Sequence, residues 1–308
     1  MTTALISHRD CILHEISPGH PECPQRIDAV NDELMRQALF DLLQHAEAPL
    51  ADKELLLHAH GAAYIDSLFD ASPKTGSVQL DPDTAMNPHT LDACLRGVGA
   101  GVLAVDQVLA GTVDNAFCLV RPPGHHAERN QAMGFCFFGN IAIAAWHALK
   151  QHGLERVAIV DFDVHHGNGT EDIVDGDKRI LFCSSFQHPF YPGNYRVNVT
   201  GQRQNVPLSA GCNSAEFRHA ITQSWLPALE SFQPEMILIS AGFDAHIEDP
   251  LAGLALLDSD FVWITTQLMD MAERHANGRI VSMLEGGYAL PALARSATAH
   301  VRGLMGLT

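Results

Sequence analysis

The sequence predicts a single α/β domain, a three-layer α/β/α fold around a mostly parallel central sheet. Short apolar runs typical of buried strands alternate along the chain with longer segments of helical spacing. Polar clusters directly follow several of these runs, as expected where parallel strands deliver side chains to one edge of a sheet. The 308 residues contain no internal repeat, low-complexity segment or linker, so residues 1–308 are expected to form one domain.

In the first half of the chain, apolar spacing predicts strands and helices in turn. Leu5 and Ile6 suit a first strand, and a proline-stiffened loop then leads into a helix over 26–43. A second helix is expected over 54–68, and a polar, proline-punctuated loop over 73–88. Small residues within 90–109 indicate a closely packed helix. A strand over 117–120 and a helix over 141–149 follow.

The second half repeats the alternation. Each expected strand is a nearly continuous apolar run, as in a parallel sheet buried on both faces. The expected strands are 157–160, 180–183, 236–240 and 280–284, and the expected helices are 217–229, 254–272 and 290–307.

Composition restricts the class of protein. The 36 acidic and 19 basic residues give a formal charge of −17, which disfavours nucleic-acid binding and is compatible with cationic ligands. No apolar stretch of about 20 residues exists, and the N-terminus lacks the features of a signal peptide. The seven cysteines form no Cys-x-x-Cys pair. We therefore expect reduced thiols in a cytoplasmic protein that binds neither nucleic acid nor membrane.

One segment ends the strand 157–160 with several side chains that can bind metal. In extended backbone, Asp161, Asp163 and His165 project to one side because successive side chains alternate. A carboxylate and an imidazole two residues apart can both reach one metal ion. This segment therefore predicts part of a metal site.

Three other polar motifs also follow predicted strands. A rigid loop presents His125 and His126 together, and Asp244 and Tyr288 each come after a later strand. The carboxyl ends of parallel strands lie at one edge of a sheet, so these motifs and Asp163 are expected to meet there. Capped loops without a shared function would have to coincide at all four positions, which disfavours that reading.

The residue types indicate metal-assisted chemistry. Asp163, His165 and Asp244 would bind one divalent ion and leave positions open for water and substrate. Zinc suits this mixed N/O set, and iron(II), cobalt or manganese would also fit. Such an ion polarises a carbonyl group and lowers the pKa of bound water.

Proton transfer is expected at the tandem histidines. One of His125 and His126 would accept the proton of the attacking water, and the other would protonate the leaving amine. Asp161 is placed to hold one imidazole, and Asn168 to hold the other without adding charge. The hydroxyl of Tyr288 would donate to the developing oxyanion. Together these residues predict hydrolysis of an amide or an ester.

These motifs resemble those of the zinc-dependent histone deacetylase family, including its bacterial histone deacetylase-like amidohydrolases and acetylpolyamine amidohydrolases. The similarity runs from His20 to the C-terminal helix, nearly the whole chain. The motifs that carry it are Arg-Pro-Pro-Gly-His-His-Ala-Glu at 121–128, Asp-Phe-Asp-Val-His-His-Gly-Asn-Gly at 161–169, Ser-Ala-Gly-Phe-Asp-Ala-His at 240–246 and Glu-Gly-Gly-Tyr at 285–288.

The resemblance implies an arginase/deacetylase-like catalytic domain over 1–308 that removes acetyl or related acyl groups from lysine side chains or similar amines. It implies one Zn²⁺ at Asp163, His165 and Asp244, and catalytic roles for the tandem histidines and the tyrosine named above. A structural K⁺ near Asp161, Asp163, His165 and Ser184 is typical of the family. The implied substrates are acylated lysine peptides or proteins, or acetylated polyamines.

The resemblance also implies substrate-binding residues. Phe135 and Tyr191 would wall an acyl-lysine tunnel, with Gly134 and Gly287 beside it. Asp83 resembles the rim aspartate that grips the backbone amides of the substrate.

Some positions separate branches of the family. Asn168 stands where class I members carry aspartate, as in class II. Tyr288 is retained where some class II proteins carry histidine, which favours deacetylase activity. Phe186 replaces the histidine of the usual Ser-Leu-His pattern, which leaves the tunnel rim and the acyl preference open. Arg26 resembles the arginine of an inner channel.

Three alternatives remain. An acetylpolyamine deacetylase stays open, although the lack of a long insertion favours acyl-lysine. A two-metal, arginase-like ureohydrolase is less favoured because it needs extra carboxylates where this chain has two histidines and a tyrosine. A catalytically silent sensor of acylated ligands is disfavoured because the expected ligands and bases are intact. A homo-oligomer is compatible with the sequence, which fixes neither the oligomeric state nor the native metal.

Overall fold

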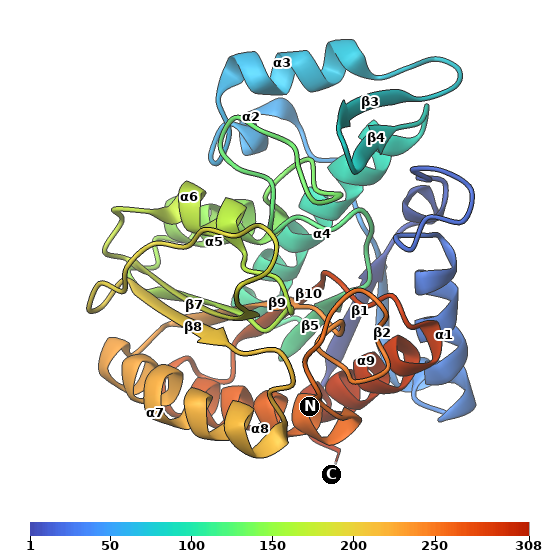
Figure 1. The fold of residues 1–308 in the computed structure, drawn as a ribbon. Helices are drawn as coiled ribbons and strands as arrows, with labels where there is room; N and C mark the ends of the chain where they lie inside the picture. Colours follow the sequence, from blue (N-terminus) through green and yellow to red (C-terminus); the bar gives the residue numbers. More distant parts are fainter. Residues whose placement is uncertain (308) are drawn as a thin grey trace.

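Eight parallel strands form the central sheet of the protein (Figure 1). The computed structural model describes residues 1–307. The strands of this sheet are β1 (Thr3–Ser7), β2 (Gln44–Glu47), β5 (Asn115–Cys118), β6 (Val157–Asp161), β7 (Ile180–Gln187), β8 (Arg203–Leu208), β9 (Met236–Ala241) and β10 (Ile280–Leu284).

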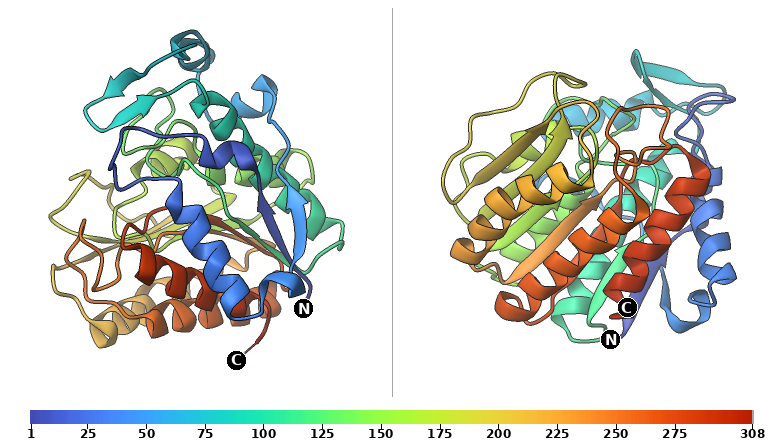
Figure 2. Two further views of the ribbon diagram at one scale, coloured as in Figure 1. Left: turned by 90° about the vertical axis from the view of Figure 1, so that its right-hand side faces the viewer. Right: turned by 60° about the horizontal axis from the view of Figure 1, so that its bottom comes forward.

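Helices cover both faces of the sheet, whose strand order is β2-β1-β5-β10-β9-β6-β7-β8 with every neighbouring pair parallel. The helices are α1 (Gln25–Arg36), α2 (Lys53–Leu56), α3 (Ala62–Ala71), α4 (Thr90–Leu109), α5 (Asn140–Lys150), α6 (Asn168–Val174), α7 (Ser214–Phe232), α8 (Asp258–His275) and α9 (Leu290–Leu304). Helices α1, α7, α8 and α9 lie on one face, and α4, α5 and α6 on the other (Figures 1 and 2). This confirms the predicted three-layer fold.

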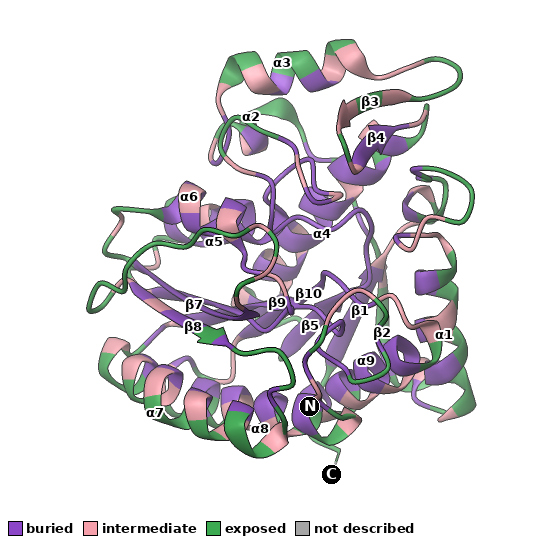
Figure 3. Cartoon of the chain, in the orientation of Figure 1, coloured by how far each residue is buried: buried purple, intermediate pink, exposed green. Residues whose placement is uncertain are grey.

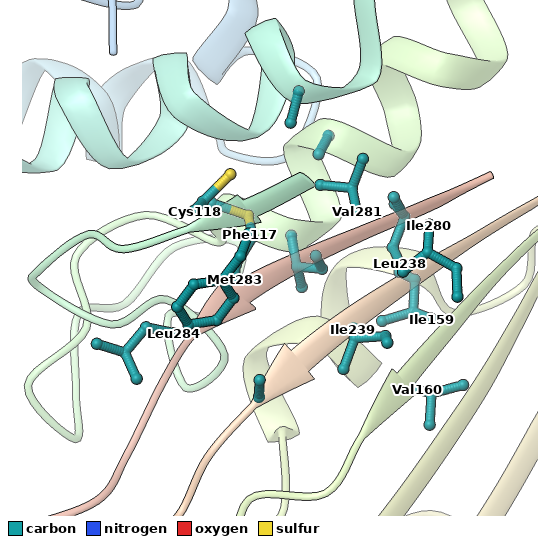
Figure 4. Close-up of a cluster of buried hydrophobic side chains, with 14 of the residues drawn as sticks. Phe117, Cys118, Ile159, Val160, Leu238, Ile239, Ile280, Val281, Met283 and Leu284 are labelled. Carbon is teal, nitrogen blue, oxygen red and sulfur yellow. The ribbon is translucent and has the colours of Figure 1, made fainter. Parts of the chain in front are cut away.

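The core follows from the apolar composition of the central strands. Every residue of β5, β6, β9 and β10 is buried, as the burial colouring of Figure 3 shows. The register places Ile159 beside Leu238 and Leu238 beside Val281, so apolar side chains form rows across the sheet (Figure 4). Each such side chain contributes about 1.5–3 kcal/mol on burial. The rigid centre of the sheet supports the loops at its carboxyl edge.

Helix α4 has the bounds expected from the sequence, and its small residues permit close packing. A Cβ atom on Gly99 would lie 1.9 Å from the carbonyl oxygen of Pro49, and one on Gly101 would lie 3.0 Å from Sδ of Met283. The helix therefore lies closer to its neighbours than larger side chains would allow.

In the first half of the chain, two predicted helices were wrong in extent. The helix expected over 26–43 ends at Arg36, because Ala38 adopts a left-handed conformation (φ 54°) and a 3-10 turn follows at Phe40–Leu42. The helix expected over 54–68 is two helices, α2 and α3. Between them the buried side chain of His60 bonds the carbonyl of Glu128 and the N–H of Gly139, which fixes a turn.

Several elements in polar segments were not predicted from the sequence. The loop expected over 73–88 contains an antiparallel hairpin of β3 (Val78–Asp81) and β4 (Thr84–Met86). The polar edge strands β2 and β8 lack an apolar pattern, and α6 was not predicted either. Helix α8 begins at Asp258 rather than 254, because the preceding residues are extended and Leu256 pairs with His246.

Within residues 1–307, none of the helices has the length and apolar character needed to cross a lipid bilayer.

Candidate active site

Asp163, His165 and Asp244, here called the metal-ligand group, converge at the carboxyl edge of the sheet. Their ligand atoms all lie within 4.8 Å of one another. Nδ1 of His165 lies 3.1 Å from Oδ1 of Asp163 and 3.2 Å from Oδ2 of Asp244. Oδ2 of Asp244 is buried and accepts no hydrogen bond. A buried carboxylate oxygen without a donor is costly unless a cation binds it.

The electrostatics of this group also fit a cation. Burial lowers the pKa of His165, but attraction to Asp163 and Asp244 outweighs burial and raises the pKa to about 10. Burial and the charge of Asp163 raise the pKa of Asp244 to about 6. Without a metal the group therefore retains a proton, which a metal ion would displace because a histidine ligand must be neutral. Two carboxylates and one imidazole suit a single Zn²⁺ ion with open positions.

Backbone N–H groups hold these ligands in place. Strand β6 ends at Asp161, so Asp163 and His165 lie in a loop, and the expectation that they alternate along an extended strand was wrong. Instead, the N–H of Asp163 donates to Oδ1 of Asp161 (3.1 Å) and the N–H of His165 donates to Oδ1 of Asp163 (2.8 Å). The N–H of Gly286 donates to the other oxygen of Asp163 (2.8 Å). These bonds turn the ligands toward one point.

Glycines leave room for the carboxylates. A Cβ atom on Gly242 would lie 2.0 Å from Oδ2 of Asp163, and one on Gly286 would lie 2.1 Å from Oδ2 of Asp244. The N–H of Val164 donates to Oδ1 of Asp244 (3.0 Å). No larger residue fits at either glycine unless the metal-ligand group moves.

The tandem histidines lie beside this group, with ring centroids 4.0 Å apart. Nδ1 of His125 lies 3.0 Å from Oδ2 of Asp161, and Nδ1 of His126 lies 2.7 Å from Oδ1 of Asn168. The structure therefore has the two side-chain pairs that the sequence predicts. Each pair leaves Nε2 of the imidazole for other contacts.

The two histidines differ in their preferred charge. Burial lowers the pKa of His125, but Asp163 and Asp161 outweigh it and raise the pKa well above 6.5. Burial, together with the positive charges of His125 and His165, lowers the pKa of His126 well below 6.5. The pKa of His125 is thus raised and that of His126 lowered, so the two neighbouring imidazoles differ in their affinity for a proton.

The carboxylate of Glu285 supports the loop that carries the histidines, a role that was not predicted. Its Oε2 accepts the N–H of Gly124 (2.7 Å) and of His125 (3.1 Å), and its Oε1 accepts the hydroxyl of Ser240 (3.0 Å). Burial raises the pKa of Glu285 to about 7.

Tyr288 lies on the loop that follows β10. Burial and the charge of Asp244 raise its pKa well above 10, so the hydroxyl stays protonated and able to donate. The guanidinium of Arg26 lies 5.1 Å from the centre of its ring. Arg26 is fully buried and donates to the carbonyl oxygens of Gly287 (2.7 Å) and Glu285 (2.5 Å). The carbonyl of Gly287 therefore contacts Arg26, and Gly287 is not among the residues that line the cavity described next.

A cavity of about 180 Å³ leads to these residues. The ring of Phe135 lies edge-on to Tyr288, and the ring of Tyr191 lies edge-on to His126. Leu251 and the Phe190 ring that stacks on His165 were not predicted, because apolar residues in loops follow no helix or strand period. The cavity is lined by Asp83, His126, Gly134, Phe135, His165, Tyr191, Leu251 and Tyr288.

The hairpin β3–β4 places Asp83 at this cavity. Oδ1 of Asp83 accepts the N–H of Gly134 (3.2 Å), and Oγ1 of Thr84 accepts the N–H of Phe135 (3.0 Å). Gly134 and Phe135 both adopt the left-handed conformation, and a Cβ atom on Gly134 would lie 2.4 Å from the ring of His126. Gly134 is therefore required for the turn that presents Phe135.

A second group of potential ligands lies away from this cavity. Nε2 of His147 and Nε2 of His152 each lie 2.7 Å from Oδ1 of Asp106. Within residues 1–307, this group and the metal-ligand group are the two sets of three such side chains close enough to hold an ion. A metal ion bound by Asp106, His147 and His152 would add to the number of ions measured per chain.

Comparison with known proteins identifies the family of this chain. The histone deacetylase domain matches residues 20–304. A histone deacetylase-like amidohydrolase of Pseudomonas aeruginosa is 41% identical over 88% of this chain and 73% of its own length. The human polyamine deacetylase HDAC10 is 35% identical over 99% of this chain, which spans 48% of that protein.

A solved structure gives the same result. The crystal structure of the HDA15 HD domain matches with a TM-score of 0.92 and 32% identity, and the match covers 100% of this chain and 89% of that one. The chain therefore belongs to the histone deacetylase family, whose members here are hydrolases named deacetylases and amidohydrolases.

Proposed function

We propose that this protein hydrolyses the amide bond of N-acylated lysine side chains, acetyl-lysine above all, and that residues 1–308 act as one catalytic domain. A single observation carries the proposal: one cavity is lined by His165, His126 and Tyr288. The other two members of the metal-ligand group lie beside His165, and His125 lies beside His126. Membership of the histone deacetylase family supports the reaction class.

In this proposal Asp163, His165 and Asp244 hold one Zn²⁺ ion. When bound, the ion polarises the amide carbonyl and makes water more acidic. Oδ2 of Asp244 is buried, accepts no hydrogen bond and lies 3.2 Å from Nδ1 of His165, so a cation at this place would contact both. The structural K⁺ expected near Asp161 and Ser184 stays a prediction. Ser184 contacts the ring of His166 through a 3.0 Å hydrogen bond.

The histidines divide the proton transfers in this proposal. His126 is neutral and lines the cavity, so it accepts a proton from the attacking water through Nε2. The water oxygen bonds to the acyl carbon and the C–N bond breaks. His125 is held protonated, and it supplies a proton to the leaving amine nitrogen. The products are a carboxylic acid and a free amine, which together contain the atoms of the amide and one water. Loss of the proton from His126 and uptake of one by His125 then restore both imidazoles.

Tyr288 provides the hydrogen-bond donor in this scheme. Its hydroxyl keeps its proton at neutral pH, so it can donate to the carbonyl oxygen as negative charge develops there. Arg26 donates hydrogen bonds to the carbonyl oxygens of Glu285 and Gly287, which limits movement of the loop that carries the Tyr288 ring.

The walls of the cavity favour an extended alkyl chain as the substrate stem. Phe135, Tyr191 and Leu251 offer apolar surface, which suits the methylenes of lysine. Asp83 lies at the same cavity, where it would accept backbone N–H groups of a peptide. An acetylated polyamine is the second candidate, because the 35% identical HDAC10 is named a polyamine deacetylase. Such a substrate has a free ammonium group, and its recognition would require an ion pair with a carboxylate of the protein.

Turnover of a fluorogenic acetyl-lysine peptide and of N-acetylputrescine tests this proposal, with Asp163→Asn as the metal-site control. We expect a higher kcat/KM for the peptide and loss of activity in the variant. A higher kcat/KM for N-acetylputrescine would move the assignment to polyamines. If the zinc-loaded protein hydrolysed neither the peptide nor N-acetylputrescine, the proposed reaction would be contradicted.

A further inference from the structure

Asp249 connects the loop of one metal ligand with the loop of the proposed oxyanion donor. Its side chain is nearly buried, 6% exposed, and lies five residues after Asp244. Oδ2 of Asp249 accepts the N–H of Tyr288 (2.7 Å) and the N–H of Ala289 (3.1 Å). Two consecutive backbone groups of the Tyr288 loop are therefore bonded to one carboxylate oxygen.

The second carboxylate oxygen of Asp249, Oδ1, holds a residue of the cavity wall. Oδ1 of Asp249 accepts the N–H of Leu251 (3.0 Å), which closes a turn around Pro250. Leu251 and Tyr288 both line the cavity. One carboxylate thus fixes two parts of the site that come from segments almost 40 residues apart in the chain.

Burial raises the pKa of Asp249, and the backbone N–H groups of Tyr288, Leu251 and Ala289 oppose that effect. Tyr288 and Ala289 immediately precede α9, so the carboxylate accepts N–H groups at the positive end of that helix. The backbone of Asp249 is itself held, because its N–H donates to the carbonyl of His246 (2.9 Å). The acceptor is therefore fixed before Tyr288 is bonded to it.

Apart from Asp249, the Tyr288 loop is held by Arg26, which bonds carbonyls that precede the tyrosine. Gly286 and Gly287 precede the tyrosine, and Gly287 has a φ of +123°, a conformation that only glycine adopts readily. Arg26 bonds the carbonyls of Glu285 and Gly287 but no group of Tyr288 itself beyond its ring. The N–H of Tyr288 depends on Asp249.

We propose that Asp249 is a positioning residue: its carboxylate sets the place of the Tyr288 hydroxyl and, through Leu251, the width of the cavity. This inference rests on the proposed function, in which Tyr288 donates to the developing oxyanion. A hydroxyl displaced by about 1 Å loses much of its effect on the rate, on the order of 100-fold in kcat.

A double-mutant cycle tests the link. We expect Asp249→Ala to lower kcat about 10- to 100-fold in the wild-type background. In the Tyr288→Phe background, the same change should alter kcat less than about 2-fold, because no hydroxyl remains to be misplaced. A trifluoroacetyl-lysine peptide keeps turnover measurable, since its carbonyl is more electrophilic. An equal loss of kcat in both backgrounds would overturn the proposal.

Conservative variants separate the effects of the two carboxylate oxygens of Asp249. Asp249→Asn retains one oxygen for the N–H groups of Tyr288 and Ala289 but places an amide NH₂ toward Leu251. We expect this variant to keep most of kcat and to raise KM. Asp177→Ala is the matched control, since Asp177 closes the same kind of turn on the surface, with Arg179. Should Asp249→Ala not fold, Asp249→Glu repeats the cycle with the charge kept and the carboxylate displaced.

A spectroscopic readout makes the inference independent of catalysis. The chain has four tyrosines, so 3-fluorotyrosine labelling gives four ¹⁹F resonances, and Tyr288→Phe identifies one. Asp249→Ala should shift or broaden that resonance, and Asp249→Asn should restore it. An unchanged Tyr288 resonance in Asp249→Ala would overturn the positioning role. If the wild type hydrolysed no acyl amide, the proposed function would fail and this spectrum would still decide the role of Asp249.

Discussion

The side-chain oxygen of Asn168 lies 2.7 Å from Nδ1 of His126. A neutral amide holds the imidazole here without stabilising its charged form as strongly as a carboxylate would. Asn168→Asp should therefore raise the pKa of His126, by about 1–3 units for a close opposite charge. Since the pKa of His126 is lowered well below 6.5 in the wild type, the neutral base is present at neutral pH.

In Asn168→Asp the acidic limb of the kcat/KM profile should move to higher pH by at least about one unit. Asn213→Asp serves as the control, because it makes the same chemical change at the N-cap of α7, where aspartate is an equally good cap. An unmoved acidic limb in Asn168→Asp would contradict the assignment of His126 as the base.

Tyr288→Phe removes the proposed oxyanion donor and leaves the ring. We expect kcat to fall about 100- to 1,000-fold with little change in KM, as for loss of one such donor elsewhere. Tyr195→Phe, which removes a hydroxyl from a 40% exposed residue, should change neither constant. A Tyr288→Phe variant that mainly raises KM would indicate a substrate-binding role instead.

Metal removal should abolish activity, and added Zn²⁺ should restore it. Elemental analysis needs care, because Asp106, His147 and His152 offer a second group of ligands. We expect His152→Ala to retain full activity and to contain one zinc per chain. A chain that keeps two metals in the His152→Ala variant would favour the two-metal ureohydrolase alternative.

Gly286→Ala should disturb the metal-ligand group although it replaces none of its three residues. The added Cβ atom would lie 2.1 Å from Oδ2 of Asp244 and 2.6 Å from Oδ2 of Asp163, so a carboxylate must move. We expect zinc affinity to fall at least about 10-fold, in the range seen when groups that support ligands are changed. Gly253→Ala is the control, because its Cβ atom would meet no atom closer than 3.4 Å.

Acid should destabilise the fold through buried neutral histidines. Burial lowers the pKa of His300 from 6.5 to about 3 and that of His60 to about 4. The unfolded chain binds more protons between these values and 6.5, so the free energy of unfolding falls as pH drops through that range. Between pH 7 and pH 5, His300 should contribute a loss of about 2 kcal/mol.

Urea denaturation at pH 7 and pH 5 measures this loss. His300→Gln replaces the imidazole between Thr265 and Ser282 with a side chain that does not titrate. The variant should be less stable at pH 7 but lose less stability on acidification. An equal loss in wild type and variant would show that His300 does not cause the pH dependence.

The sequence predicted the architecture because apolar runs report burial directly. The strands β9 and β10 and the helix α4 are continuous apolar or small-residue segments, and each lies where expected. The edge strands β2 and β8 are polar, so no periodicity indicated them. The break between α2 and α3 depends on His60 contacting Glu128 and Gly139, and a contact between distant residues cannot be read from local spacing.

The same distinction applies to the candidate site. The proposed metal ligands and the tandem histidines stand in dense motifs with specific chemistry, so single residues such as Asp244 could be named in advance as candidates. Supporting groups such as Asp249 and Glu285 act through backbone N–H groups of remote loops. Leu251 lies in a loop that also contains Ile247 and Leu254, so its residue type alone does not mark it as part of the cavity wall. Their roles arise from tertiary structure, which leaves no local pattern to recognise.

The order of strands in the sheet has a consequence for biosynthesis. Strand β10 is the last to be synthesised, yet it lies between β5 and β9 at the centre of the sheet. Until residues 280–284 leave the ribosome, the nascent chain has two open apolar sheet edges and lacks Tyr288. A truncated or stalled chain would be both inactive and prone to aggregate, which makes it a substrate for chaperones until synthesis is complete.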